Sequence, residues 1–510
     1  MFMAPQMASS GLKVTHYKSK YYSPCYQSPK TYTEDYLKLN VSAKKNNVSK
    51  PVIAWLEGKE YSSLEMTTLF KNLVMEDIVV VTINYRISIF GFLCLGVPEA
   101  PGNAGLKDVI LALQWIEENI NKFGGDPKNV MLLGHGSGAA MVDLITMSPF
   151  SEDLLHKAFV ISGSALAPWA ISYDPIGYAN IVAENLQYSG KSPMELAMKF
   201  KSTRLNVLLA ALEVEFTNNT ALFAPCVEND KLQNVFLNDT PINILKSGSF
   251  NHIPYVAAYT HREGTIKAKE FLDWRPKMES DFTQFIPGDL EFGSEINKTI
   301  AMNNIREFYF HNTTSINITE YLDYYRDTSV IVPLIRGVTA RAETSTANVY
   351  LLEYAYHCIS NADWPFNDIS VVENGIKQGS RDNVLYKNMT KHEEDAKRSL
   401  INYIISFART GAPNIVSEHP ARQWLPVNNE TINYLYIGGA CNQKHTEELK
   451  QNPYSKSMKL WTDLYDHYYK TPLKYSDSGN ANNYFRILIR ITILIGLLLL
   501  YCCFSRIIRK

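Results

Sequence analysis

Residues 130–145 read Val130-Met-Leu-Leu-Gly-His-Gly-Ser-Gly-Ala-Ala-Met-Val-Asp-Leu-Ile145, and this stretch decides the fold. Its first four residues predict a buried strand, and the run from Ala139 predicts a helix that follows a glycine-rich turn. Strand, tight turn and helix are the context of a nucleophile elbow, whose motif is G-x-S-x-G. The third residue of the motif is Gly136 here, so the position of the nucleophile carries no side chain.

The segments on either side of the elbow alternate between strands and helices. Short, branched apolar runs at 52–56, 78–84 and 158–161 are typical of strands that a parallel sheet buries on both faces. Residues 109–120 have the spacing of an amphipathic helix that a Gly-Gly-Asp-Pro turn ends, and a further strand is expected at 347–354. We therefore expect an α/β fold with a mostly parallel central sheet flanked by helices.

Composition fits a large globular domain and argues against one class of partner. The chain has 510 residues, of which 46% are hydrophobic and 12% aromatic, with a formal net charge of -1. Acidic and basic residues are mixed along it, without the basic stripe that a phosphate backbone attracts. We therefore expect no nucleic-acid partner.

The C-terminus predicts a membrane anchor. Residues 487–504 are apolar except for Arg490, and as a helix they would span about 27 Å, close to the roughly 30 Å of a bilayer core. The basic tail 505–510 suits the cytoplasmic side. We expect an extracellular domain at 1–470, a juxtamembrane linker at 471–486, and a single span in the plasma membrane.

Two alternatives for this segment stay open. One is a buried helix at the end of a soluble domain, although Gly496 to Tyr501 shows no polar face. The other is a glycolipid-anchor signal, because small residues at 476–481 precede a polar spacer and the apolar tail. The basic ending argues against the glycolipid signal. The second alternative also leaves the main domain outside the cell.

Glycosylation sequons support an extracellular location. The pattern N-x-[ST] occurs nine times without proline at its centre. The asparagines are Asn40, Asn47, Asn218, Asn238, Asn297, Asn312, Asn317, Asn388 and Asn429. The chain starts without the basic and apolar regions of a secretory signal, and we interpret this as a missing N-terminus.

The cysteines predict neither a dense disulfide framework nor a metal site. Five of them are widely spaced before the anchor, whereas a metal site would need closer pairs. They are Cys25, Cys94, Cys226, Cys358 and Cys441. We expect no metal and no cofactor.

Four segments together resemble the type-B carboxylesterase and cholinesterase family. They are residues 33–41, residues 81–86 with 90–93, the run from 100–108 to 123–127, and the elbow. The similarity extends from about residue 2 to about residue 469 and implies an α/β-hydrolase fold. Residue 2 resembles a point some sixty residues into the family domain, so the first strands of that domain are expected to be missing from this chain.

The resemblance assigns a catalytic triad that this chain does not keep. In the family a serine attacks the ester, a histidine takes its proton and a glutamate orients the histidine. Glu263 matches the acid, but Gly136 stands at the serine position and Gln378 at the histidine position. Only the orienting residue remains.

The oxyanion hole is altered as well. The family's His-Gly-Gly-Gly-Phe segment reads Glu57-Gly-Lys-Glu-Tyr61 here, so Lys59 and Glu60 replace two glycines whose backbone amides would approach the oxyanion. Ser137 occupies the third oxyanion-hole position, directly after the elbow glycine. The resemblance therefore predicts a carboxylesterase homologue without enzyme activity.

What the resemblance implies for function is adhesion or ligand binding. The chain is similar to non-catalytic members such as the neuroligins, gliotactin, neurotactin and glutactin, which bind extracellular protein ligands, and a homodimer through a helix pair is consistent with it. Two alternatives remain: an active esterase that uses Ser137 after a shift of the elbow, and a binder of small hydrophobic esters that does not hydrolyse them. A dinucleotide fingerprint at Gly134, Gly136 and Ala139 is a further alternative, but it lacks the acidic residue expected after the next strand.

Overall fold

The computed structural model describes residues 37–44, 48–58, 72–190, 192–311, 313, 315–357, 391–414, 423–428, 430–440 and 443–472. Several sequence predictions lie outside these residues. They are the oxyanion-hole positions Lys59 and Glu60, the triad position Gln378, the sequons at Asn47, Asn312, Asn388 and Asn429, and everything predicted beyond residue 472.

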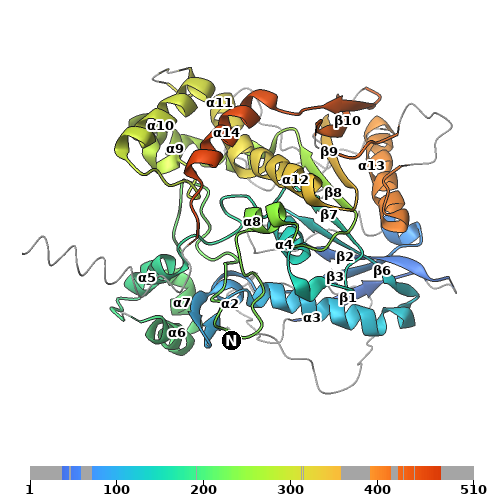
Figure 1. The fold of residues 1–510 in the computed structure, drawn as a ribbon, viewed down its shortest axis with the longest axis horizontal. Coiled ribbons are helices and arrows are strands. Elements are labelled where there is room, and N and C mark those ends of the chain that lie inside the picture. The colour runs from blue at the N-terminus through green and yellow to red at the C-terminus, as the bar shows by residue number, and fades with distance from the viewer. Residues whose placement is uncertain are drawn as a thin grey trace, which may run out of the picture.

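The centre of the described fold is one large sheet with the strand order β1-β3-β2-β6-β7-β8-β9-β10-β11 (Figure 1). Its strands are β1 (Leu39–Ser42), β2 (Lys50–Leu56), β3 (Val79–Ile83), β6 (Gly125–His135), β7 (Lys157–Ile161), β8 (Tyr255–Thr260), β9 (Val349–His357), β10 (Asn433–Ala440) and β11 (Thr446–Gln451). The strands from β3 to β10 pair in parallel, whereas the edge strands β1 and β11 run antiparallel to their neighbours. The predicted mostly parallel sheet is confirmed.

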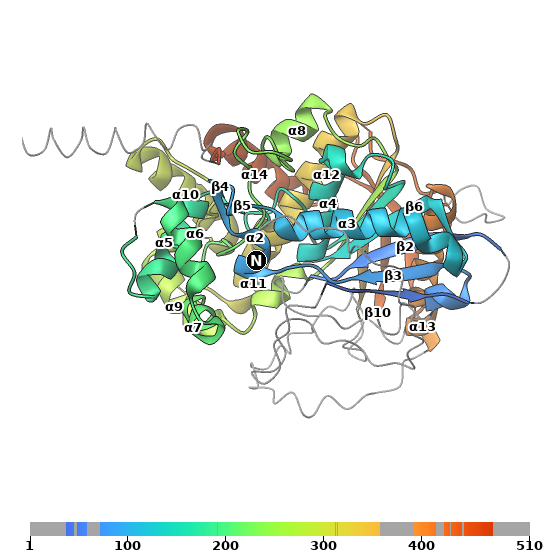
Figure 2. The ribbon, with the colours of Figure 1, turned by 90° about the horizontal axis from the view of Figure 1, so that it is seen from below.

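Helices cover both faces of the sheet. They are α2 (Ser88–Phe92), α3 (Ala104–Asn119), α4 (Ser137–Thr146), α5 (Pro175–Asn185), α6 (Pro193–Ser202), α7 (Leu205–Ala211), α8 (Pro241–Ser247), α9 (Phe271–Ser280), α10 (Glu295–Phe310), α11 (Ile318–Arg326), α12 (Val332–Thr344), α13 (Lys391–Thr410) and α14 (Ser455–Tyr468). Figure 2 shows α3 and α13 on opposite sides of the strands.

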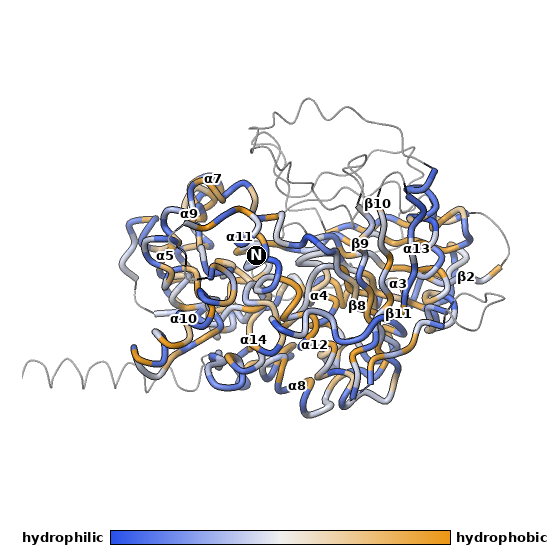
Figure 3. Tube along the Cα trace, turned by 90° about the horizontal axis from the view of Figure 1, so that it is seen from above, coloured by the Kyte–Doolittle hydropathy of each residue, from blue (hydrophilic) through white to orange (hydrophobic). Residues whose placement is uncertain are grey.

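Strand alternation explains the two faces. Along β2, Val52 and Ala54 belong to the core under α3, α4 and α12, while Ile53 and Trp55 belong to the core under α13. Successive side chains of a strand point to opposite faces, so a strand buried on both sides is apolar throughout. In Figure 3, hydrophobic segments lie along β8 and α4, whereas β11 at the edge of the sheet is hydrophilic.

The expected elements are present, but several boundaries differ from their predictions, and the largest differences are at the starts of α3, which begins at Ala104 rather than at residue 109, and of β6. We expected a turn at 124–127 and a strand from Val130, but β6 already begins at Gly125. Gly125 pairs with Lys50 of β2, and a Cβ atom on it would lie within 2.8 Å of both Ile120 and Val52. Because the two strands lie so close together, the residues of the predicted turn belong to the sheet.

Among the helices of the described residues, none combines the length and apolarity that a membrane crossing needs.

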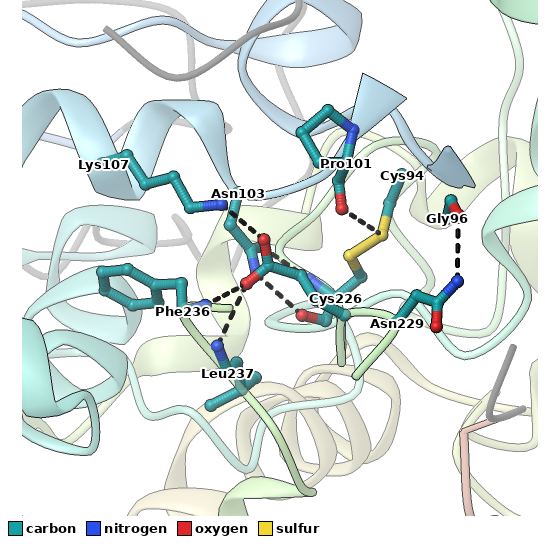
Figure 4. Close-up of a disulfide and its surroundings, with 10 residues drawn as sticks. Cys94, Gly96, Pro101, Asn103, Lys107, Cys226, Asn229, Phe236 and Leu237 are labelled. Atoms are coloured by element: carbon teal, nitrogen blue, oxygen red, sulfur yellow. Dashed lines mark hydrogen bonds and ion pairs between the residues drawn. A yellow bond between two sulfur atoms is a disulfide. The ribbon is translucent and has the colours of Figure 1, made fainter. Parts of the chain in front are cut away.

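A disulfide between Cys94 and Cys226 joins two distant parts of the chain (Figure 4). Cys94 begins β4 (Cys94–Val97), which pairs with β5 (Ala100–Pro101), and Cys226 lies in the long segment before α8. The backbone of Cys226 forms a reciprocal pair with the buried side chain of Asn103: the amide nitrogen of Asn103 donates to the carbonyl at 2.8 Å, and its oxygen accepts from the N–H at 2.9 Å. We call this region the disulfide staple.

The buried carboxylate of Glu228 completes the staple. It accepts hydrogen bonds from the backbone N–H groups of Phe236 and Leu237 and a charged bond of 2.6 Å from Lys107 (Figure 4). The side chain of Asn229 donates to the carbonyl of Gly96 at 3.0 Å. Segments that are more than a hundred residues apart are thereby held by paired polar groups as well as by a covalent bond.

Candidate active site

The elbow has the backbone that its sequence predicts. Gly136 lies between β6 and α4 with φ of 58° and ψ of -121°, a conformation that residues with a side chain rarely adopt. Its N–H donates to the carbonyl of Ile161 at the end of β7, at 2.9 Å. The turn therefore keeps the sharp geometry of an elbow although its central residue has no nucleophile.

The space beside Gly136 is filled by the chain itself. A Cβ atom on Gly136 would lie 2.5 Å from the carbonyl oxygen of Gly58, which is closer than real Cβ atoms approach such an atom. Gly58 follows β2, the neighbour of β6 in the sheet. The two segments touch so closely that the volume of a serine side chain at position 136 is already occupied by a carbonyl group.

Glycines make the contact between the end of β2 and the start of α4 possible. A Cβ atom on Gly138 would lie 2.2 Å from the carbonyl oxygen of Leu56, and one on Gly58 would lie 2.0 Å from the backbone nitrogen of Gly138. Both distances involve backbone atoms, which cannot rotate out of the way as a side chain can. The N-terminus of α4 is thus closed by the end of β2.

Ser137 is buried in the same contact. It is the first residue of α4 and is 5% exposed, and a Cβ atom on Gly58 would lie 2.2 Å from its Oγ. The hydroxyl therefore packs against the Gly58 backbone at the closed end of the helix. A nucleophile must instead face a site where an ester can lie within about 3–3.5 Å of it.

A hydrogen-bonded pair of side chains that the sequence analysis did not predict lies at the mouth of the elbow. Glu57 follows β2 and His135 ends β6, and the His135 Nδ1 lies 3.1 Å from the Glu57 carboxylate. Glu57 also accepts a hydrogen bond of 3.2 Å from the indole of Trp55, and its carbonyl accepts one from Tyr85 at 2.7 Å. In the sequence analysis, Glu57 appears only as the residue that replaces the histidine of the family's His-Gly-Gly-Gly-Phe segment.

The surroundings of His135 raise the pKa of its imidazole. Burial lowers the pKa of this imidazole, but the hydrogen bond to Glu57 and the charges of Glu57 and Glu263 outweigh burial, so the pKa is raised overall. The imidazole is thus held by the carboxylate of Glu57, and this contact ties the end of β6 to the residue that follows β2.

Glu263, the one triad position that keeps its residue type, is engaged by neighbours. It begins the short helix η3 (Glu263–Lys267) after β8, and one carboxylate oxygen accepts hydrogen bonds from the Ser162 hydroxyl and the Thr260 N–H, each at 2.6 Å. These donors anchor the acid loop to the ends of β7 and β8. The carboxylate thus orients strand ends in this structure.

His261, two residues before Glu263, forms a hydrogen bond with a different carboxylate. The Nδ1 of His261 lies 2.9 Å from the buried carboxylate of Glu353 on β9, and Tyr454 approaches the same carboxylate at 3.3 Å. His261 therefore belongs to a separate polar cluster. Of the predicted site residues, the structure brings Gly136, Ser137 and Glu263 to the same end of the sheet, while Lys59, Glu60 and Gln378 lie outside its described part.

Comparison with known proteins gives a family and a fold. The carboxylesterase family matches residues 3–461. Bile salt-activated lipase of Rattus norvegicus is 25% identical, over 89% of this chain and 77% of its own length. Neuroligin-2 of Mus musculus is 26% identical over 88% of this chain but only 55% of its own length. Venom carboxylesterase-6 of Apis mellifera is 27% identical over 81% of this chain and 77% of its own length.

A solved structure agrees with this architecture. Juvenile hormone esterase from Manduca sexta superimposes with a TM-score of 0.72 at 21% identity, over 86% of each chain. This likeness shows an α/β-hydrolase fold. The relatives include esterases as well as neuroligins, so similarity alone does not decide between catalysis and its loss.

Proposed function

This chain belongs to the carboxylesterase family, and within that family we propose that it is a member without ester hydrolysis that acts outside the cell by binding a protein partner. The observation that carries the proposal is the closed elbow. The nucleophile position is Gly136, and the Gly58 carbonyl occupies the space that a serine side chain would need. Adhesion and ligand capture are the roles that this leaves to the surface of the fold.

The size of the rate loss expected from the missing triad residues supports the absence of catalysis. Removing the serine or the histidine of a triad costs about a millionfold in rate, and what remains comes from the oxyanion hole and binding. An oxyanion hole needs backbone N–H groups about 3 Å from the oxyanion. The Gly58 carbonyl oxygen lies 2.5 Å from where a Cβ atom of residue 136 would be, and its partial negative charge would repel an anion that formed beside that position. The remaining catalytic power is therefore also expected to be small.

Two observations support an extracellular body. Disulfides persist in oxidising compartments, and Cys94 and Cys226 form one. The sequon asparagines within the described residues are all exposed or partly exposed, so each is accessible to a glycosyltransferase or to solvent. They are Asn40, Asn218, Asn238, Asn297 and Asn317.

The anchor and the partner remain parts of the proposal. Residues 487–504 are proposed to hold the domain at the plasma membrane, with a glycolipid anchor as the alternative. Neuroligin-2 is among the relatives, and the match spans about half of its length. By analogy we propose an extracellular protein ligand and a homodimer as the working assembly.

Display on cells tests the binding function. Cells that display the full chain should bind other cells or matrix several-fold more than matched cells that display an unrelated glycoprotein at equal density. A parallel measurement follows hydrolysis of a small acyl ester by the same cells. Equal binding by both cell populations, together with ester turnover above the control, would contradict the proposal.

A further inference from the structure

Asp289 carries a carboxyl group that the fold buries completely. The residue is 0% exposed and lies after the short helix η4 (Phe282–Phe285). One carboxyl oxygen accepts a hydrogen bond of 3.1 Å from the Tyr465 hydroxyl on α14, whereas Oδ2 has no hydrogen-bond partner among the described residues. A buried carboxylate with so few donors is unfavourable, because burial removes the water that would solvate its charge. The surroundings therefore favour the protonated form.

The groups that face this carboxyl come from several elements. The tyrosines among them are Tyr465 on α14, Tyr469 directly after it, Tyr324 on α11 and Tyr173 before α5. Burial raises the pKa of each of these hydroxyls, so they stay neutral around pH 7. Arg336 of α12 is a cation that faces the same carboxyl, and its guanidinium lies 3.8 Å from the centroid of the Tyr465 ring.

The balance of these effects places the titration of Asp289 near neutral pH. Burial is the largest cause and raises the pKa, whereas the charge of Arg336 and the hydrogen bond from Tyr465 lower it. The result is a pKa raised to about 7. The carboxyl thus changes its charge between mildly acidic and neutral solution.

The backbone of Asp289 lies where the chain leaves α14. Its carbonyl accepts a hydrogen bond of 2.8 Å from the N–H of Lys470, and Leu290 forms an antiparallel bridge with Tyr469. We call the contact of Asp289 and Leu290 with Tyr469 and Lys470 the α14 latch. The buried carboxyl is therefore part of the contact that fixes the end of the helix. The predicted linker at 471–486 begins directly after it.

We propose that Asp289 makes the α14 latch sensitive to pH, because its protonated form keeps the latch closed and its ionised form favours opening. The latch is a property of the folded domain and does not depend on the proposed binding function. An open latch exposes the carboxyl to water, where its pKa returns to about 3.9. The closed form has the higher pKa, so its stability is fully present below about pH 4 and is lost as the pH rises to about 7.

Hydrogen exchange, read by mass spectrometry on the full chain in detergent, tests the latch. The readout is the opening constant of the peptide that contains Lys470, corrected for the intrinsic exchange rate at each pH. One proton is released on opening, so this constant should rise about tenfold per pH unit between about pH 5 and 7 and level off above that. The opening constant of β7 (Lys157–Ile161) serves as the internal control and should not follow this profile.

Three variants assign the pH dependence to the carboxyl. Asp289→Asn keeps the size of the side chain and removes its titration, so the opening constant should no longer change with pH. Asp273→Asn replaces an exposed carboxyl on α9, serves as the matched control and should keep the native profile. Tyr465→Phe removes a donor to the carboxylate, so the pH at which the constant levels off should rise by about half a unit.

The proposal is overturned if the native chain shows no rise, or if Asp289→Asn keeps the rise. It also fails if β7 follows the same profile, because the loosening then belongs to the whole domain. Should Asp289→Asn not fold, Tyr465→Phe decides, and a profile identical to that of the native chain contradicts the latch.

Discussion

The elbow and the disulfide staple both bring backbone segments into very close contact, but they do it by different means. At the elbow, Gly58 and Gly138 allow contacts that any Cβ atom would prevent. At the staple, Gly102 leaves room for both sulfur atoms, since a Cβ atom there would lie 2.6 Å from each. Around the staple, Asn103 and Glu228 then form hydrogen bonds with the surrounding backbone.

The staple and the elbow contribute to different properties of the protein: the staple supports folding, whereas the elbow bears on catalysis. The staple keeps the features that a chain needs to fold in an oxidising compartment: a covalent link and buried polar groups with partners. The elbow keeps the left-handed backbone of Gly136, but the Gly58 carbonyl leaves no room for a Cβ atom at that position. On our proposal the fold has been retained as a scaffold while its catalytic space has been closed.

Removing the staple should have the largest effect on stability. The double variant Cys94→Ala with Cys226→Ala opens a loop of 132 residues, and releasing a loop of that size costs about 4 kcal/mol. Thermal unfolding should show a clearly lower Tm. Asn229→Ala, which removes one hydrogen bond at the edge of the staple, should cost only about 1 kcal/mol. Equal Tm values for both variants would show that the disulfide is not what holds the region.

A substitution that crowds the elbow should reduce the free energy of unfolding slightly less than removal of the disulfide does. Gly138→Ala places a methyl group 2.2 Å from the Leu56 carbonyl, and such overpacking against backbone typically costs about 1–3 kcal/mol even though alanine favours helices. The control is Gly293→Ala, because a Cβ atom at Gly293 meets nothing within 4 Å. Denaturant unfolding compares the two. A neutral or stabilising Gly138→Ala would mean that β2 and α4 are not in tight contact.

We expect the smallest effect on stability from the contact between Glu57 and His135 beside the elbow. His135 has a raised pKa in the folded state, so its stabilising contribution is fully present below the unfolded value of about 6.5 and is lost as the pH rises through the folded value. Glu57→Gln removes the charge and should cost about 1 kcal/mol at pH 6 and less at high pH. Tm measured from pH 5 to 9 gives both profiles. Parallel profiles for the native chain and the variant would rule out this ion pair.

Much of the elbow could be predicted from the sequence because its signals are local. The apolar run before Gly134 and the glycine spacing specify strand, turn and helix within sixteen residues. The missing nucleophile is visible in the sequence itself. The closed space is not visible, because it depends on how near Gly58 approaches, and Gly58 is far away in the chain.

The pair of Glu57 and His135 could not be predicted because strand order differs from chain order. β2 pairs with β6 although β3 comes between them in sequence, and the register sets Leu56 opposite Gly134. Glu57, directly after the end of β2, and His135, the last residue of β6, then meet. Opposite charges at those two ends are the signal that would have suggested it. The Cys94–Cys226 bond was missed for a similar reason, since widely spaced cysteines allow many pairings.

The most direct test of the closed elbow is labelling of the native chain with a fluorophosphonate, beside Ser137→Ala, Gly136→Ser combined with Gln378→His, and an active carboxylesterase as positive control. We predict labelling of the active enzyme alone, with the double variant unlabelled because the Gly58 carbonyl lies where its new Cβ atom must go. Labelling of the native chain that disappears in Ser137→Ala would contradict the account and identify Ser137 as a working nucleophile.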